Sequence, residues 1–236
     1  ERCETPFDYA QGKRDAKNTK NLFHLNPQNS HLIGVCGCLA QQEKEALLKR
    51  FPFVDFVLGP GSLHELKAII QSHLAPRVSH LDCFIETCDP EQRNLPQKRR
   101  PSSSAYVSIM YGCDNFCSYC IVPYVRGREV SRPKEDIIRE IEGLDKTIFK
   151  EVVLLGQNVN SYRDARREMR DAKDSNCVSS SGLASLLYDV HSLEGIDRFR
   201  FLTSHPRDMS DDIIQAVKEL PKACEYCHLP IQSGDD

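Results

Sequence analysis

Strand-like apolar runs alternate with helical segments along most of this chain, and polar loops follow the strands directly. The expected strands span residues 105–110, 151–155, 198–203 and 228–231. The expected helices between them span residues 133–144, 182–193 and 210–220. Strands that alternate with helices form parallel β/α units, whose functional residues gather at the carboxyl ends of the strands. The pattern predicts an α/β fold, either a (β/α) barrel or an open parallel sheet, with its site at that edge.

The first third of the chain shows the same alternation on a smaller scale. Residues 31–35 form an apolar run, residues 39–50 have helical spacing and residues 54–58 are strand-like. Ser62 is expected to cap a second helix. That helix would carry four apolar residues on one face: Leu63, Leu66, Ile69 and Ile70. We therefore expect a small α/β domain over residues 1–74, a linker over 75–104 and a larger domain over 105–236.

Three cysteines stand close together after the expected strand at 105–110, namely Cys113, Cys117 and Cys120. A structural zinc site uses four ligands in a closed tetrahedron, and no fourth cysteine or histidine follows closely. A cubane iron–sulfur cluster held by three thiolates keeps one iron open to a further ligand. The spacing favours such a cluster over an incomplete zinc site.

Composition limits where this protein works. The 236 residues carry a net charge of −3, which gives no global nucleic-acid signature. Eleven cysteines, an odd number without an apolar leader, do not form a secreted disulfide framework. No apolar run approaches the ~18 residues of a membrane span. We expect a cytoplasmic protein, or an organellar one in a eukaryote, with some cysteines held by metal.

The segment from Tyr111 to Pro133 carries a specific resemblance. Its Cys-x3-Cys-x2-Cys spacing, with Tyr119 before the last cysteine, resembles the radical S-adenosylmethionine enzymes. The surrounding residues resemble the methylthiotransferase family within that group. The segment 154–162, which contains Gly156-Gln-Asn158, is most similar to the branch that acts on dimethylallyl-adenosine in tRNA. Thr203-Ser-His-Pro206 and the segment 228–234 fit the same branch.

The resemblance implies roles for particular residues. Cys113, Cys117 and Cys120 would hold a [4Fe–4S] cluster whose open iron takes the amino and carboxylate groups of S-adenosylmethionine. The cluster would pass one electron to the sulfonium, and the resulting deoxyadenosyl radical would abstract hydrogen from an adenine carbon. Five further residues are expected to bind the cofactor: Tyr119, Gly156, Gln157, Ser204 and His205.

The family also carries a second [4Fe–4S] cluster, held by three cysteines of the N-terminal domain. Cys38 matches the third of these ligands and Cys3 is a tentative match to the second, while the first should lie upstream of Glu1. Cys36 is expected to be a buried thiol beside Cys38. Cys83, Cys88 and Cys177 are assigned no catalytic role.

The implied fold is a partial radical SAM barrel preceded by part of the small α/β domain. The implied reaction is methylthiolation at position 2 of a dimethylallyl-modified adenosine next to the anticodon. The partners would be the tRNA anticodon stem-loop and an electron donor such as flavodoxin or ferredoxin, with no membrane and a monomeric enzyme. Both ends of the chain read as cuts through a longer protein, so this segment alone is expected to be inactive.

Three alternatives stay open at this point. Two lie within the same chemistry: methylthiolation of threonylcarbamoyl-adenosine in tRNA, or of an aspartate in a ribosomal protein. The third is a non-enzymatic, cysteine-rich zinc or RNA-binding module. Cys224 and Cys227, a C-x2-C pair before His228, are interpreted as packing thiols rather than as a redox pair or half of a zinc site.

Overall fold

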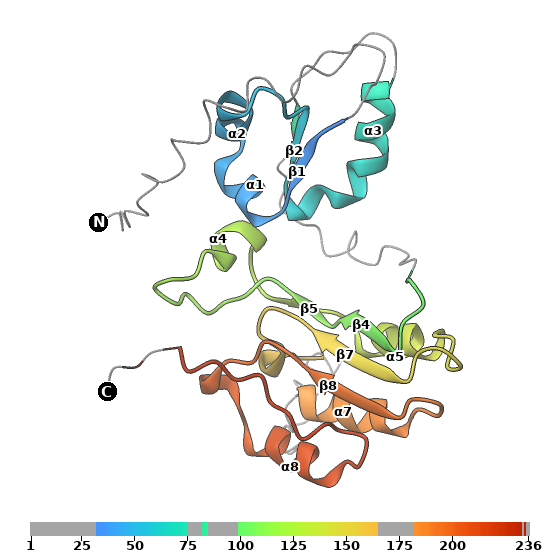
Figure 1. Ribbon diagram of the computed structural model, residues 1–236. Coiled ribbons are helices and arrows are strands. Elements are labelled where there is room, and N and C mark those ends of the chain that lie inside the picture. The colour runs from blue at the N-terminus through green and yellow to red at the C-terminus, as the bar shows by residue number, and fades with distance from the viewer. Residues whose placement is uncertain (1–31, 75–81, 85–98, 165–181, 233, 235–236) are drawn as a thin grey trace, which may run out of the picture. The chain divides into compact units, whose positions relative to one another are not determined.

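The computed structural model describes residues 32–74, 82–84, 99–164, 182–232 and 234 (Figure 1). The chain divides into two compact units, Glu1–Glu86 and Thr87–Asp236. The division falls inside the segment expected to be a linker. No helix in the described ranges is long and apolar enough to cross a membrane.

The first unit is a three-stranded parallel sheet covered by helices. Its strands are β1 (Gly34–Cys36), β2 (Phe56–Leu58) and β3 (Asp82–Phe84), in the order β1-β2-β3. Its helices are α1 (Cys38–Glu43), α2 (Glu45–Arg50), the 3-10 helix η3 (Pro60–Glu65) and α3 (Leu66–Leu74). β3 lies within the expected linker, so part of that segment belongs to the first unit.

The central strand β2 is buried on both faces because its side chains alternate. Val57 packs with Ala40, Leu47 and Leu48 of α1 and α2. Phe56 and Leu58 point the other way and pack with Ile69 of α3 in a separate cluster. Figure 1 shows α1 and α2 on one side of the sheet and α3 on the other.

Two helix predictions in this unit were wrong in detail. The helix expected over residues 39–50 breaks at Lys44, whose φ is 50°; α1 packs on β1 and β2, and α2 packs on β2. Ser62 does not begin a helix, because Pro60 already starts η3 at its first position. The tighter 3-10 turn rotates Leu63 away from the buried face, and Leu63 is 47% exposed.

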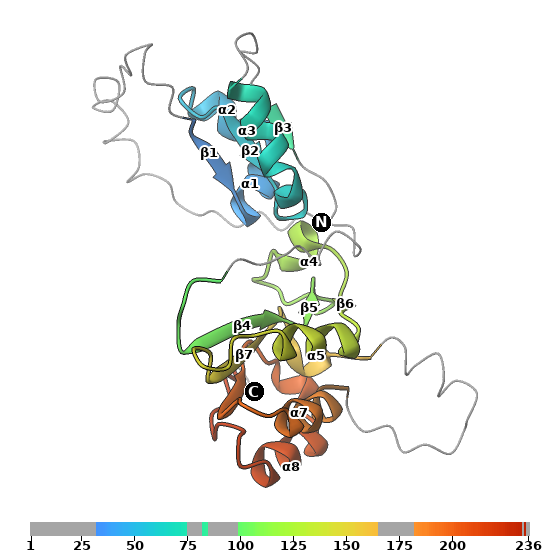
Figure 2. The ribbon, with the colours of Figure 1, turned by 90° about the vertical axis from the view of Figure 1, so that its right-hand side faces the viewer.

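The second unit has a parallel sheet in the order β4-β7-β8. These strands are β4 (Ser104–Ser108), β7 (Glu151–Leu155) and β8 (Arg198–Phe201). Three longer helices follow them: α5 (Lys134–Glu142), α7 (Gly182–Ser192) and α8 (Asp211–Glu219). Figure 2 shows these helices along one face of the sheet. The α/β class and the parallel strands are thus confirmed, whereas the described strands form an open sheet rather than a full barrel.

The core of the second unit lies between that sheet face and the helices. Alternate strand residues point into it, among them Val107, Leu154 and Phe201, and they meet Ile137 of α5 and Leu187 of α7. The opposite face presents Tyr106, Val153 and Arg200, which lie side by side in register. The period of two along each strand separates these two faces.

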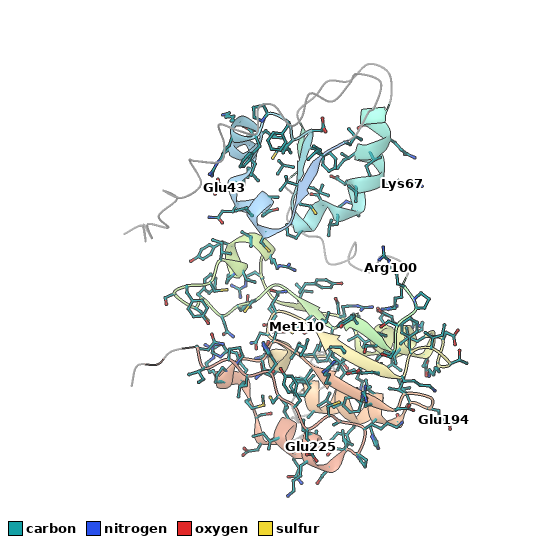
Figure 3. All side chains as sticks on the ribbon, viewed as in Figure 1. Glu43, Lys67, Arg100, Met110, Glu194 and Glu225 are labelled. Atoms are coloured by element: carbon teal, nitrogen blue, oxygen red, sulfur yellow. The ribbon has the colours of Figure 1, made fainter. Side chains whose placement is uncertain are left out.

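Short elements connect the strands at their carboxyl edge. They are β5 (Met110–Tyr111), α4 (Val122–Arg126), β6 (Val130–Ser131) and the 3-10 helices η5 (Val159–Ser161) and η6 (Pro206–Asp208). β5 and β6 pair in antiparallel fashion, so the chain returns to β5 after the cysteine segment. Met110 of β5 is labelled in Figure 3.

The strand expected at residues 228–231 is absent from the described structure. A single parallel bridge joins Phe199 to Ala223, the Cys224 N–H donates to the Phe199 carbonyl at 2.9 Å, and no strand follows among the described residues. Pro230 has no N–H for a ladder, and Ile231 is 82% exposed. The segment from Gln232 onward therefore follows no strand, contrary to the prediction.

Candidate functional site

The cysteine segment is a loop closed at its base by two glycines. Gly112 has φ 67° and Gly127 has φ 75°, a conformation that favours glycine. The Cys113 N–H donates to the carbonyl of Gly127 at 3.2 Å. A Cβ on Gly112 would lie 2.0 Å from the carbonyl oxygen of Arg128. The close approach of Gly112-Cys113 to Gly127-Arg128 fixes the position of the first cysteine of the loop.

The three thiols of the loop differ in exposure but influence one another. Cys113 is buried, whereas Cys117 and Cys120 are partly exposed. Burial raises the pKa of the Cys113 thiol, a hydrogen bond from the Asn115 backbone opposes this, and the charges of Glu129, Cys120 and Cys117 raise it further. The Asn115 N–H lies 3.4 Å from Cys113 Sγ.

The three cysteines of the loop are the candidate ligands of the metal centre. Among the described residues, no three His, Cys, Asp or Glu side chains are arranged to hold one ion. Tetrahedral zinc with Zn–S bonds of about 2.3 Å would need its sulfurs close together. The three cysteines nevertheless lie on one short loop, and the charges of Cys117 and Cys120 act on Cys113.

The segment after β8 lies against this loop. His205 Nε2 is 3.8 Å from Cys117 Sγ. The Asn115 side chain, between the first two cysteines, donates to Asp208 Oδ2 at 3.1 Å and accepts from Arg207. The cysteine loop and the segment after β8 are thereby joined by two contacts, each between residues more than eighty positions apart in sequence.

The segment after β7 completes the arrangement. The Asn158 amide donates to Asp208 Oδ2 at 2.6 Å, and Thr203 Oγ1 donates to the Gly156 carbonyl at 2.9 Å. Thr203 has φ 65°, an uncommon value for a β-branched residue. Three hydrogen bonds hold it there, because its N–H also donates to His228 Nδ1 and its carbonyl accepts from Val159. Such over-determined strain clusters at functional sites.

A cavity of about 450 Å³ opens between these segments. It is lined from the cysteine loop, β6, the segment after β7 and η6, and its charged residues are Asp114, Glu129, Arg163, Arg207 and Asp208. Burial raises the pKa of Glu129, and the hydroxyl of Ser161, which donates at 2.7 Å, opposes the rise. For Asp208, burial is outweighed by donors from Asn158, Asn115 and Arg207, and the pKa is lowered. The cavity thus offers both charges and fixed amides to a polar ligand.

The predicted cofactor residues occupy different environments. Tyr119 is 66% exposed, and its pKa is raised by partial desolvation and then by the charges of Cys117 and Cys120. Ser204 is buried, and its N–H donates to the His228 carbonyl. Gln157 is half-buried. Gly156 also has a packing reason to be glycine, because a Cβ there would meet Met110 Cγ at 2.4 Å.

Two polar residues of this site, Asn158 and Asp208, were not predicted from the sequence as site residues. Asn158 is 3% exposed, and its Oδ1 has no hydrogen-bond partner among the described residues. Asp208 joins three segments through its carboxylate. Asn158 stands in a noted motif, but nothing in the sequence pattern singles out Asp208 from other acidic loop residues.

The cysteines expected to hold or neighbour the second cluster belong to the first unit. Cys38 begins α1 and is partly exposed, while Cys36 at the end of β1 is exposed, contrary to the expected burial. β1 is an edge strand, which explains the exposure. Cys83 lies in β3 and packs on the first core. Cys3, Cys88 and Cys177 lie outside the described residues.

The C-x2-C pair also departs from expectation. Cys224 is partly exposed and Cys227 exposed, and the described residues here form no strand. Burial raises the pKa of Cys227, opposed by Ser204. His228 is accounted for by its bonds to Thr203 and Ser204.

A three-cysteine loop at the carboxyl edge of a parallel α/β sheet is the arrangement expected of a radical S-adenosylmethionine enzyme. The family model of the radical SAM superfamily matches residues 107–236, and the chain belongs to that superfamily. An iron–sulfur cluster and S-adenosylmethionine are the cofactors of this class.

Within the superfamily, the chain is similar to enzymes named tRNA-2-methylthio-N(6)-dimethylallyladenosine synthase. The relative from Thermodesulfovibrio yellowstonii is 43% identical over 214 residues, covering 90% of this chain and 46% of that protein. The relative from Caldicellulosiruptor saccharolyticus is 47% identical over 205 residues, covering 86% and 41%. The chain thus spans less than half the length of the curated relatives it matches.

A solved structure also matches, that of the radical S-adenosylmethionine methyltransferase TsrM from Kitasatospora setae with cobalamin and a [4Fe-4S] cluster. The match has a TM-score of 0.36 and 13% sequence identity, and it covers 50% of this chain and 20% of that one. At this level the likeness carries no argument.

Proposed function

We propose that this chain is part of an enzyme that methylthiolates a dimethylallyl-modified adenosine of tRNA, next to the anticodon, at position 2 of its adenine. The observation that carries the proposal is the meeting of the cysteine loop with the segments after β7 and β8. The similarity to tRNA methylthio-adenosine synthases over 90% of the chain supports the substrate class.

Cys113, Cys117 and Cys120 would hold a [4Fe–4S] cluster. The bound cluster supplies the low-potential electron that cleaves S-adenosylmethionine and so starts hydrogen abstraction. The chain's own residues position this loop: Gly112 and Gly127 close its base, and Asp208 holds the Asn115 side chain.

The cavity beside the loop suits the amino-acid end of S-adenosylmethionine. An ammonium group needs acceptors, and Glu129 and Asp208 line the cavity with carboxylates. A carboxylate needs donors, and Arg163 and Arg207 line the same cavity. Gly156, Gln157, Ser204 and His205 follow the same two strands, and Tyr119 lies beside Cys117.

The rest of the enzyme's organisation belongs to the same proposal. A second [4Fe–4S] cluster would use Cys38, with Cys3 as a further ligand. The sheet would be part of a (β/α) barrel, preceded by the N-terminal domain and a linker. The enzyme would act as a cytoplasmic monomer with flavodoxin or ferredoxin as electron donor.

The test compares tRNA from cells with and without the gene, with mass spectrometry of the anticodon stem-loop nucleosides. We expect loss of methylthio-dimethylallyl-adenosine in the deletion strain, restored by the full-length gene but not by its Cys113→Ala variant. Cys83→Ala is the matched control, because it removes a thiol of β3 outside the loop.

Other outcomes separate the alternatives. Unchanged levels of that nucleoside in the deletion strain contradict the proposal. Loss of methylthio groups from threonylcarbamoyl-adenosine, or from a ribosomal-protein aspartate, would move the substrate within the same chemistry. If the Cys113→Ala variant restores methylthio-dimethylallyl-adenosine, the cysteine loop is not needed for the reaction. That result would favour the zinc or RNA-binding module.

A further inference from the structure

His205 contacts a cysteine of the loop directly. Its Nε2 lies 3.8 Å from Cys117 Sγ, within hydrogen-bond range for sulfur. Cys117 is partly exposed, so its sulfur is reachable by a donor from the segment after β8.

The tautomer of His205 follows from its other nitrogen. The backbone N–H of Arg207 donates to Nδ1 at 3.2 Å, so Nδ1 is the acceptor in this ring. In a neutral imidazole the second nitrogen then carries the hydrogen. Nε2 therefore has an N–H to donate, and its partner is the Cys117 sulfur.

A buried amide holds the backbone of His205 in place. Asn160 is 4% exposed; its Nδ2 donates to the His205 carbonyl at 2.7 Å, and its Oδ1 accepts from the His205 N–H at 2.9 Å. The Asn160 side chain thus fixes both the N–H and the carbonyl of His205. Since Asn160 belongs to η5, the ring position is set from the segment after β7 and not only from its own loop.

We propose that His205 donates a hydrogen bond from Nε2 to the Cys117 thiolate and thereby raises the reduction potential of the cluster held by the loop. This inference rests on the proposed function, because it requires the cluster. Hydrogen bonds to cysteine sulfurs help set the potentials of iron–sulfur clusters, and they favour the more negative, reduced state. Both ring nitrogens of His205 are then engaged by the protein.

Two substitutions at His205 isolate the donor. His205→Asn places an amide near the position of Nδ1, where its oxygen can accept from Arg207, but nothing reaches Cys117. His205→Gln extends to the position of Nε2 and can restore an N–H donor. The matched control is His64→Asn, a histidine of the first unit that bonds to its own turn at Gly61.

The experiment reconstitutes the full-length protein and these variants anaerobically and measures the midpoint potential of the loop cluster by redox titration followed by electron paramagnetic resonance. Iron and sulfide contents are measured on the same samples. We expect a lower potential in His205→Asn at equal iron content, a value in His205→Gln returned toward the wild type, and no shift in His64→Asn.

Equal potentials in all variants would overturn the inference, as would equal shifts in His205→Asn and His205→Gln. Loss of the cluster in both His205→Asn and His205→Gln would also contradict it, because the role of His205 would then be structural. A wild-type protein that takes up no iron or sulfide would instead refute the proposed function.

Discussion

The Asn158 amide donates a 2.6 Å hydrogen bond to the Asp208 carboxylate and so joins the segment after β7 to the one after β8. The same carboxylate oxygen accepts from Asn115 of the cysteine loop. Asp208 is therefore the common acceptor of the three segments that form the candidate site.

Replacing Asp208 should lower stability in a pH-dependent way. Its donors hold the folded-state pKa below the ordinary value, so its contribution is present above the unfolded-state pKa of about 3.9 and is lost as pH falls through the lower folded value. We expect Asp208→Asn to cost about 1 kcal/mol at pH 7 and less near pH 3. Urea denaturation at both pH values checks this. Asp197→Asn, at an exposed position before β8, is the control; a pH-independent loss in Asp208→Asn would contradict the account.

Glu129 should behave in the opposite sense. Its half-buried carboxyl has a raised pKa because burial disfavours the charge. Ionisation therefore weakens the fold as pH rises through the folded value, and no penalty exists below the unfolded value of about 4.3. Glu129→Gln, which can still accept from Ser161, should raise stability at pH 8 by up to about 1 kcal/mol and have little effect at pH 4. A variant that is less stable than wild type at pH 8 would show that the carboxylate charge has a favourable partner.

Gly156 tests packing at the end of β7. A Cβ there would lie 2.4 Å from Met110 Cγ and 3.1 Å from Val159 Cγ1. Gly156→Ala should cost about 1–3 kcal/mol through overpacking. Combining it with Met110→Ala should cost less than the sum of the two single changes, because the smaller side chain vacates the space. If the losses in the free energy of unfolding are additive in chemical denaturation, Gly156 is not required for its packing against Met110.

Tyr162 tests a buried hydroxyl behind the site. Tyr162 is 1% exposed, and its hydroxyl donates to the Arg132 carbonyl at 2.9 Å. Burial strongly raises its pKa, so it stays a neutral donor. Tyr162→Phe should cost about 1 kcal/mol. Tyr188→Phe, an exposed tyrosine bonded to Glu219, should change stability by less than about 0.5 kcal/mol; equal effects would mean that burial of the hydroxyl is unimportant.

The parallel β/α pattern could be predicted because its signal is local. Runs such as Glu151–Leu155 and helical spacing over α5, α7 and α8 appear within single elements. The break at Lys44 could not be predicted, because an ordinary lysine adopts φ 50° there and the two short helices pack separately on the sheet. The expected strand at 228–231 failed because strand formation also needs a ladder, and Pro230 cannot donate to one.

The site divides in the same way. The spacing of Cys113, Cys117 and Cys120 carries its chemistry in the sequence, and so these residues could be named. Asp208 and Asn160 could not, because their roles arise from contacts across 93 and 45 residues of sequence separation. Such contacts exist only once the strands have placed their loops side by side.

The central claim is that Cys113, Cys117 and Cys120 hold a [4Fe–4S] cluster. Its most direct test is to measure iron and acid-labile sulfide in the anaerobically reconstituted protein. The wild type is compared with the triple variant Cys113→Ala/Cys117→Ala/Cys120→Ala. The account predicts that the triple variant loses about four iron atoms and four sulfides relative to the wild type, while Cys83→Ala loses none. Equal iron in the wild type and the triple variant, or bound zinc without iron in the wild type, would contradict it.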